Sequence, residues 1–280
     1  MNKFTITGVV LTLVVVGLAV WVYWPAPQAP AIVPPAPLPT LEVIIATTTA
    51  SVIGTSVQGR DITAHTFGTG ATNLLFVGGT HGGYEANTVR LADAMIEHLH
   101  ANAALIPQDI TVHIIPVLNP DSYALPVSAS DQARRFNANS VDLNRNFDCK
   151  WAPESSWRGQ TVSAGTAAFS EPEAAALRDY VLRTNPAAAV FWHSIANNVY
   201  ASECENGILP DTLALMHAYA DAGGYGKVEK FDAYPITGDV EGWLASINIP
   251  AVTVELETRN SIEWERNLAG TLATIELFAQ

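Results

Sequence analysis

Short apolar runs alternate with helical patterns along most of this chain, and no other feature constrains its fold as strongly. Four runs rich in Val, Ile, Leu or Phe have the length and composition of buried strands, namely 73–79, 110–118, 187–193 and 251–257. Four other segments space their apolar residues as helices do, namely 87–100, 173–183, 211–222 and 262–279. This alternation predicts an α/β domain with a mixed, largely parallel central sheet flanked by helices.

Residues with metal-binding or catalytic chemistry stand at the ends of three predicted strands. His81 follows the strand at 73–79, His193 ends the strand at 187–193, and Glu255 lies near the end of the strand at 251–257. In open α/β sheets, ligands bind beyond the carboxyl ends of the strands. We therefore expect these three side chains to meet at one edge of the sheet.

A glycine-rich turn follows the first of these strands. Residues 78–85 read Gly-Gly-Thr-His-Gly-Gly-Tyr-Glu, and the glycines allow a turn tight enough for His81 and Glu85 to face one point. A catalytic zinc ion is held by three imidazole or carboxylate ligands and keeps one position open. Each histidine alone would more often be a hydrogen-bonded structural residue, but together with Glu85 they predict one zinc site, with His193 as third ligand.

The amino-terminal segment is predicted to be a membrane anchor. No charged side chain occurs between Phe4 and Leu41, and the apolar run 6–24 is long enough to span a bilayer as a helix. Lys3 at its start places the rest of the chain outside the cytoplasm. A cleaved signal peptide and a buried core helix are the alternatives. We expect residues 1–24 to form a single-pass transmembrane helix with an extracytoplasmic catalytic domain.

A proline-rich linker follows the predicted anchor. Residues 25–40 contain seven prolines, which predict an extended polyproline spacer between the membrane and the catalytic domain. Residues 41–280 show no repeat and no further break in composition, so we expect them to form a single domain.

Charge and cysteine content exclude some classes of protein. A formal net charge of −13 without a basic tract argues against nucleic-acid binding. The two cysteines, Cys149 and Cys204, are too few for a disulfide-rich scaffold or a cysteine-based zinc site. Either a single disulfide or two free thiols is consistent with the sequence.

The motifs and their order resemble the M14 zinc carboxypeptidases, particularly the bacterial murein-peptide amidases. Besides the turn with His81 and the strand with His193, the matching strings are Ile-Gly-Thr-Ser-Val-Gln-Gly-Arg at 53–60, Asn-Pro-Asp-Ser-Tyr at 119–123, Arg-Phe-Asn-Ala-Asn-Ser-Val-Asp-Leu-Asn-Arg-Asn-Phe at 135–147, Ser-Glu-Pro-Glu at 170–173 and Val-Glu-Leu at 254–256. The resemblance covers nearly all of residues 50–260. It implies a metallocarboxypeptidase-like fold with one Zn²⁺ per chain, held by His81, Glu85 and His193.

The resemblance also implies catalytic roles for two residues. Glu255 matches the glutamate that takes a proton from the attacking water and passes it to the leaving amine. Arg135 matches the arginine that stabilises the oxyanion. Glu257 lies on the same strand face as Glu255, and only the resemblance selects between them. The neighbouring Arg134 is expected to face solvent.

Three further residues match those that bind the substrate. Asn144 and Arg145 correspond to the pair that grips a terminal carboxylate, and Tyr234 corresponds to a tyrosine that closes over the substrate. Asp239 and Glu241 fall where relatives select the leaving side chain, so they would favour a cationic one. Alternatively, they are the acidic start of a helix at 240–246.

The spacing of two predicted ligands departs from the family pattern. The family places two residues between the first histidine and the glutamate, whereas three separate His81 from Glu85. The turn therefore needs a one-residue bulge, which Gly82 and Gly83 could accommodate.

The main hypothesis is a zinc exopeptidase that removes a C-terminal residue from a peptide with a free carboxylate, such as a cell-wall peptide. An N-acyl amino-acid deacylase of the succinylglutamate desuccinylase or aspartoacylase type is a second hypothesis, since those relatives share the His/Glu and Asn-Arg layout. A catalytically inactive wall-binding module is the third. We expect a monomer.

Overall fold

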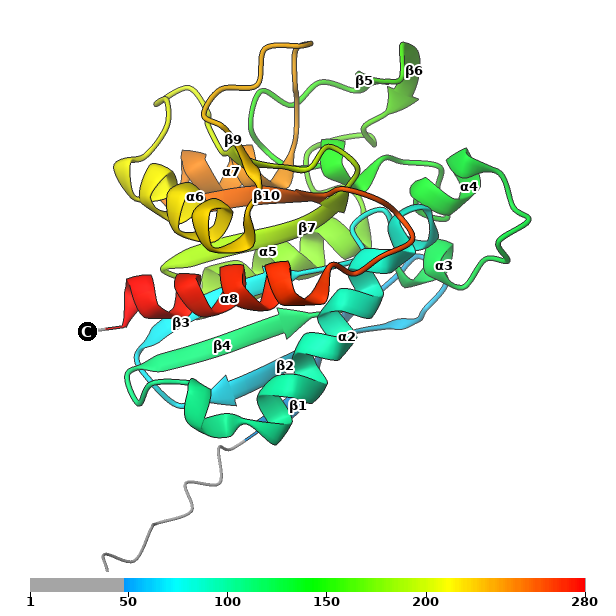
Figure 1. The fold of residues 1–280 in the computed structure, drawn as a ribbon. Helices are drawn as coiled ribbons and strands as arrows, with labels where there is room; N and C mark the ends of the chain where they lie inside the picture. The colour runs from blue at the N-terminus through cyan, green and yellow to red at the C-terminus, as the bar shows by residue number, and fades with distance from the viewer. Residues whose placement is uncertain (1–47, 280) are drawn as a thin grey trace, which may run out of the picture. The chain divides into compact units, whose positions relative to one another are not determined.

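The computed structural model describes residues 48–279, all of which lie in one compact unit (Figure 1). The membrane anchor predicted at 1–24 and the linker predicted at 25–40 lie outside the described residues. Among the helices that the structure does describe, none combines the length and the apolar character needed to cross a bilayer.

An eight-stranded sheet forms the centre of the described part, in the order β1-β2-β4-β3-β7-β10-β8-β9. Its strands are β1 Thr48–Thr55, β2 Asp61–Gly68, β3 Thr72–Val77, β4 Ile110–Ile115, β7 Ala188–Ser194, β8 Asn198–Ala201, β9 Gly226–Val228 and β10 Ala251–Leu256. The four central strands β4, β3, β7 and β10 run parallel to one another. Antiparallel pairs flank them, β1 with β2 and β2 with β4 on one side and β10 with β8 on the other. The mixed sheet predicted from the sequence is confirmed.

Helices cover both faces of this sheet (Figure 1). One face packs against α2 Ala86–Ala101, α6 Pro210–Gly223 and α8 Trp264–Phe278, and the other against α5 Pro172–Thr184 and α7 Val240–Ser246. Successive residues of a strand point to opposite faces, so Val190 and Trp192 of β7 join the first core while Ala189 and Phe191 join the second. Because both faces are buried, the central strands are apolar throughout and visible in the sequence.

Short elements and loops gather beyond the carboxyl ends of the central strands. They are η1 Gly82–Glu85, α3 Pro120–Tyr123, α4 Asp131–Arg135, η3 Leu143–Arg145 and the hairpin of β5 Glu154–Trp157 and β6 Gln160–Ser163. The remaining short helix, η2 Ala103–Leu105, follows α2. These connections surround the edge of the sheet at which we predicted His81, His193 and Glu255 to meet.

A disulfide joins two of these loops. Cys149, which follows η3, is bonded to Cys204, which follows β8, and the described residues contain no free cysteine. Of the two states that the sequence allowed, the structure therefore has the disulfide.

Removing this disulfide should lower the free energy of unfolding. The bridge closes a loop with a sequence separation of 55 residues, for which the chain-entropy model gives about 4 kcal/mol. We expect the double substitution Cys149→Ser and Cys204→Ser to lower the urea midpoint, and the reduced wild type to match it. Identical midpoints for the oxidised and reduced wild type would contradict a stabilising disulfide.

Candidate metal centre and active site

The turn after β3 brings His81 and Glu85 together despite the extra residue between them. Residues 82–85 form the single 3₁₀ turn η1, which absorbs the insertion. Gly82 has φ = +44°, and a Cβ atom there would lie 1.8 Å from the Ser122 hydroxyl oxygen, so glycine is required. The His81 Nδ1 atom lies 3.0 Å from Glu85 Oε1. The bulge expected from the sequence therefore leaves both side chains directed at one point.

Arg134 supports the same turn, contrary to the expectation that it faces solvent. Its guanidinium donates to the Gly83 carbonyl oxygen, and its Nε atom is buried. The expectation was wrong because α4 packs against η1, a contact between distant segments that local sequence pattern does not reveal.

The third ligand and the predicted base come from neighbouring strands. β7 and β10 run in parallel, and their register pairs His193 with Glu255, so the two side chains stand next to each other on one face of the sheet. Glu257 lies beyond the end of β10, where its exposed carboxylate is 3.6 Å from Arg266 Nη1. Only Glu255 lines the cavity, which separates the two carboxylates that the sequence could not distinguish.

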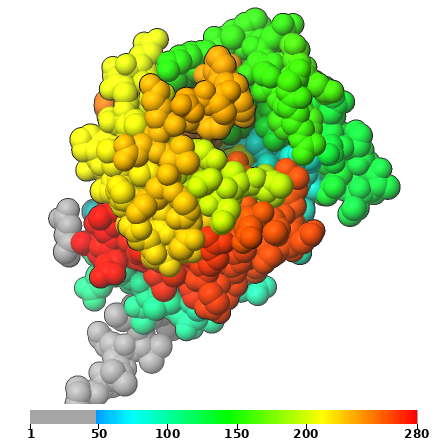
Figure 2. Space-filling model, turned by 45° about the horizontal axis from the view of Figure 1, so that its top comes forward, coloured from blue at the N-terminus to red at the C-terminus, as the bar shows by residue number. Residues whose placement is uncertain are grey.

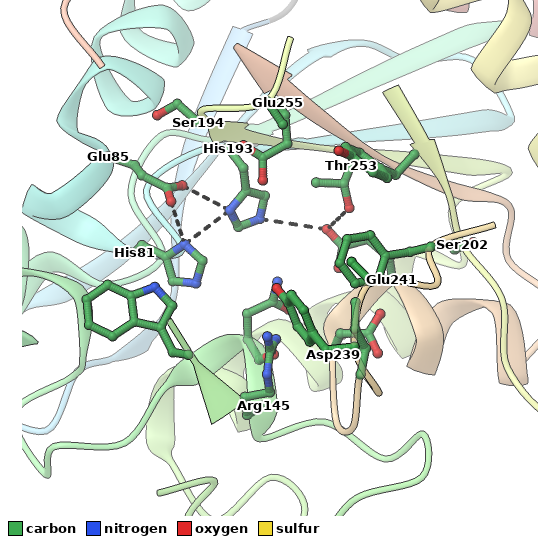
Figure 3. Close-up of a pocket in the computed structure, with 18 of the residues that line it drawn as sticks. His81, Glu85, Arg145, His193, Ser194, Ser202, Asp239, Glu241, Thr253 and Glu255 are labelled. Atoms are coloured by element: carbon green, nitrogen blue, oxygen red, sulfur yellow. Dashed lines mark hydrogen bonds and ion pairs between the residues drawn. The ribbon is translucent and has the colours of Figure 1, made fainter. Parts of the chain in front are cut away.

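The three predicted ligands converge on one point (Figure 3). His193 Nδ1 lies 3.2 Å from His81 Nδ1 and 3.0 Å from Glu85 Oε2. Ligand atoms about 2.0–2.1 Å from a tetrahedral zinc ion lie about 3.3 Å from one another, so this spacing suits zinc. All three side chains are buried. His81, Glu85 and His193 thus form a potential metal site.

The charges around this point also favour a cation. Burial opposes ionisation of Glu85, but the charges and hydrogen bonds of His81 and His193 hold the pKa of that carboxyl well below its usual range. Burial lowers the pKa of His193, yet Glu85, with smaller effects of Glu241 and Glu255, outweighs it and raises this pKa to about 9. The surrounding carboxylates thus attract positive charge, which a divalent ion supplies while leaving both imidazoles neutral as ligands.

Asp142 links the metal site to Arg135. Its Oδ1 atom lies 3.4 Å from His81 Nε2, and its Oδ2 atom accepts hydrogen bonds from Arg135 Nε and Nη2 at 3.1 and 2.9 Å. Burial raises the pKa of Asp142, but Arg135 and His81 more than offset this and keep it well below the usual range. A carboxylate at the outer nitrogen keeps Nδ1 of His81 available as a ligand atom.

Burial raises the pKa of Glu255 to about 7, and the negative charge of Glu85 adds to the effect. His193 and Arg135 partly offset it, and the Oε2 atom is buried without a hydrogen-bond partner. A carboxylate in this position, beside the ligand cluster and without a hydrogen-bond partner, can accept a proton and return it.

A cavity of about 660 Å³ contains every site residue that the sequence predicted. Its lining includes His81, Glu85, Arg135, Asn144, Arg145, His193, Tyr234 and Glu255. Figure 2 looks into this hollow, which lies between the green segment and the yellow-to-orange segments. Its volume is within the range of small-molecule and peptide sites.

Asn144 and Arg145 are fixed by the backbone around them. The Asn144 side chain accepts from the Val240 backbone N–H at 3.0 Å, and Arg145 Nη1 donates to the Asn144 carbonyl oxygen at 2.5 Å. The Arg145 Nε atom is buried without a hydrogen-bond partner. Tyr234, on the loop before α7, lines the cavity while remaining 45% exposed, and its ring packs edge to face against Phe231 with the ring centroids 4.8 Å apart.

The two acidic residues before and within α7 differ in their contacts. Asp239 caps α7 by accepting from the Gly242 N–H at 2.8 Å, as the helix-start alternative predicted, and its carboxylate also lines the cavity. Glu241 is buried, accepts from the Thr253 hydroxyl at 2.8 Å and lies 3.7 Å from His193 Nε2. Burial and the charge of Glu241 raise the pKa of Asp239 to about 6.

Sequence reasoning missed several residues that complete the site. Asp142 lies inside the quoted Val-Asp-Leu-Asn-Arg string, so its position next to Arg135 and Asn144 could have suggested a role. Tyr84 and Arg259 line the cavity as well, but 175 positions separate them and no local pattern joins them.

The mixed sheet, with a potential metal site beyond the carboxyl ends of its central strands, is the arrangement expected of a metallocarboxypeptidase. Residues 46–264 match the profile of the zinc carboxypeptidases, Peptidase_M14, and the chain belongs to this family. The resemblance inferred from the motifs is therefore confirmed.

Individual relatives are similar to this chain at modest identity. Murein peptide amidase A of Escherichia coli K12 is 27% identical over 199 residues, which cover 68% of this chain and 73% of the relative. Gamma-D-glutamyl-L-diamino acid endopeptidase 1 of Lysinibacillus sphaericus is 25% identical over 169 residues, 52% of this chain and 42% of the relative. The crystal structure of carboxypeptidase A from Helicoverpa armigera superposes with a TM-score of 0.67 at 22% identity, covering 82% and 69% of the two chains. The chain spans only 22% and 42% of the length of the first two curated relatives that it matches.

Removing the charge of Asp142, which lies next to the outer nitrogen of His81, should weaken metal binding. We expect Asp142→Asn to lower zinc affinity by about 10- to 100-fold, because the neutral amide no longer orients the imidazole or balances Arg135. Competition with a chromogenic chelator measures this constant without reference to activity. Asp131→Asn, an exposed aspartate 3.5 Å from Arg158, serves as the matched control and should bind zinc as the wild type does. Equal affinities for the two variants would contradict the role of Asp142.

Proposed function

We propose that this chain is a zinc exopeptidase that hydrolyses the peptide or amide bond before a C-terminal residue, acting on short cell-wall peptides. One observation carries the proposal: the ligand cluster, the unpartnered carboxylate of Glu255 and the cationic residues Arg135 and Arg145 line one cavity.

The catalytic chemistry follows from the residues around the ligand cluster. When bound, zinc polarises the scissile carbonyl and lowers the pKa of a water molecule. Glu255, beside His193, accepts a proton from that water and delivers it to the leaving nitrogen. Arg135, whose Nη1 atom is 3.2 Å from His81 Nδ1, donates to the carbonyl oxygen as negative charge develops there.

The leaving residue is bound at the end of the cavity that contains Asn144 and Arg145. Asn144 and the free Nε of Arg145 hold its terminal carboxylate, which confers exopeptidase behaviour. Asp239 and Glu241 line the same end, so a leaving residue with an additional ammonium group is favoured. This fits the diamino acid in the name of the Lysinibacillus relative. Tyr234 closes over the bound residue.

An extracytoplasmic location is part of the proposal, as is attachment to the membrane through residues 1–24. The disulfide between Cys149 and Cys204 supports the location, because such bonds persist in oxidising compartments. Cell-wall peptides are accessible from there.

Hydrolysis of defined peptides tests the function. We expect the zinc-loaded protein to release the C-terminal diamino acid from short murein peptides, to lose activity with chelator and to regain it with zinc. N-acyl amino acids in parallel reactions test the deacylase alternative, and preferential cleavage of those would reject the peptidase.

The role of Glu255 has its own test. Glu255→Gln should lower kcat by about 100- to 10,000-fold with unchanged zinc content, because the amide cannot accept the proton. Glu257→Gln, two positions further along at an exposed site, should behave as the wild type. Full activity in Glu255→Gln would reject the mechanism, and a zinc-loaded wild type without hydrolytic activity would favour a wall-binding module.

A further inference from the structure

Arg259 is a cavity-lining arginine that the proposed mechanism does not use. It lies in the loop between β10 and α8, and its Nη2 atom donates to the Tyr84 hydroxyl at 2.9 Å. Its guanidinium carbon lies 4.1 Å from the centre of the Tyr84 ring. Its Nε atom is buried and has no hydrogen-bond partner.

Arg259 differs in its ion pairing from the two other arginines near Tyr84. Among residues 48–279, no carboxylate forms an ion pair with it, whereas Arg135 and Arg158 are paired with Asp142 and Asp131. The guanidinium carbons of Arg135 and Arg158 lie 5.8 and 5.7 Å from the same Tyr84 ring. Of these three arginines around one ring, Arg259 is the one whose charge has no paired carboxylate among the described residues, so this side of the cavity favours an anionic ligand.

The loop that carries Arg259 is held in place. Asn87 Nδ2 donates to the carbonyl oxygens of Thr258 and Ser261 at 2.7 and 3.2 Å. Arg90 donates to the Asn260 carbonyl oxygen at 3.1 Å. The arginine is therefore pre-positioned, and binding an anion requires little further ordering of the chain.

Arg259 lies at the opposite side of the metal ligands from Arg145. Its Nη2 atom is 3.5 Å from the Ser194 carbonyl oxygen, and its other partner, Tyr84, precedes the ligand Glu85. Figure 3 shows Ser194 and Glu85 on one side of the two histidines, with Arg145 and Asp239 on the other. Given the proposed function, the leaving residue occupies the Arg145 side, so the residue before the scissile bond lies towards Arg259.

The chemistry of that residue distinguishes two kinds of peptide. An ordinary α-linked residue continues into another amide, which has no charge. A glutamyl residue linked through its γ-carboxyl keeps a free α-carboxylate next to the scissile bond. We infer that Arg259 is a specificity-determining residue that binds this carboxylate and so selects γ-glutamyl peptides. The inference rests on the proposed function and adds a residue to it.

A pair of substrates that differ only in this carboxylate tests the inference. One is a γ-D-glutamyl-diamino acid peptide with a free α-carboxylate, and the other carries the α-carboxamide. We expect the wild type to prefer the free acid in kcat/KM by about 10- to 100-fold, mostly through KM, as a charge-assisted hydrogen bond would give. Arg259→Gln should reduce kcat/KM for the free acid alone and bring the two substrates within about 3-fold of each other.

Control variants show whether Arg259 binds the substrate carboxylate or only stabilises the fold. Arg178→Gln removes an arginine on α5 outside the cavity lining and should keep the wild-type preference. Arg259→Lys should restore part of the preference. Zinc content and melting temperature establish that Arg259→Gln is folded. Equal wild-type rates for the acid and the carboxamide, or an equal loss for both in Arg259→Gln, would overturn the inference.

Binding measurements keep this test independent of catalysis. Calorimetry of the same two peptides with Glu255→Gln should show tighter binding of the free acid, and this difference should disappear in the double variant with Arg259→Gln. A carboxylate preference that depends on Arg259 without any turnover by the wild type would reject the proposed function and keep the inference. Turnover without a carboxylate preference would reject only the inference.

Discussion

The remainder of the site depends on the close approach of His81, His193 and Glu85. Their potential ligand atoms lie 3.0–3.2 Å apart, as the ligands of one zinc ion would, and they are buried among carboxylates. Without a cation, Glu85 and Glu255 repel each other, and protons are drawn to His193. A divalent ion would reduce the repulsion between the two carboxylates and would take the place of the proton on His193. The surrounding groups follow from that requirement: Asp142 orients His81, and Arg135 balances Asp142 while remaining directed at the ligand cluster.

Positively and negatively charged side chains occupy different parts of the cavity. The centre is anionic, whereas Arg145 lies on one side and Arg259 on the other. Glu241 adds negative charge next to the centre, 3.7 Å from His193 Nε2, and the carboxylate of Asp239 also lines the cavity. Under the proposed function, a ligand complementary to this pattern carries carboxylates at two places and an ammonium group on its leaving residue, as a small, highly charged peptide does.

The central strands and the long helices could be predicted because burial on both sheet faces leaves apolar runs of the right length. Parallel pairing then brought His81, His193 and Glu255 to one edge, so most of the metal site followed from strand ends alone. The last two strands on one side of the sheet, β8 and the edge strand β9, are short and partly exposed, and no hydrophobic pattern marked them. Contacts such as Arg134 with Gly83 or Arg259 with Tyr84 join distant segments, and only the folded chain reveals them.

The disulfide described above has a consequence for the walls of the cavity. Cys149 follows the segment that carries Asn144 and Arg145, and its carbonyl oxygen accepts from the Gly238 N–H at 2.8 Å, just before Asp239. Cys204 stands beside Ser202 and Glu203, which line the cavity from the loop after β8. A covalent bond thus couples two walls that different parts of the sheet would otherwise position separately. The bond therefore limits how far these two walls can move apart when a ligand enters between them.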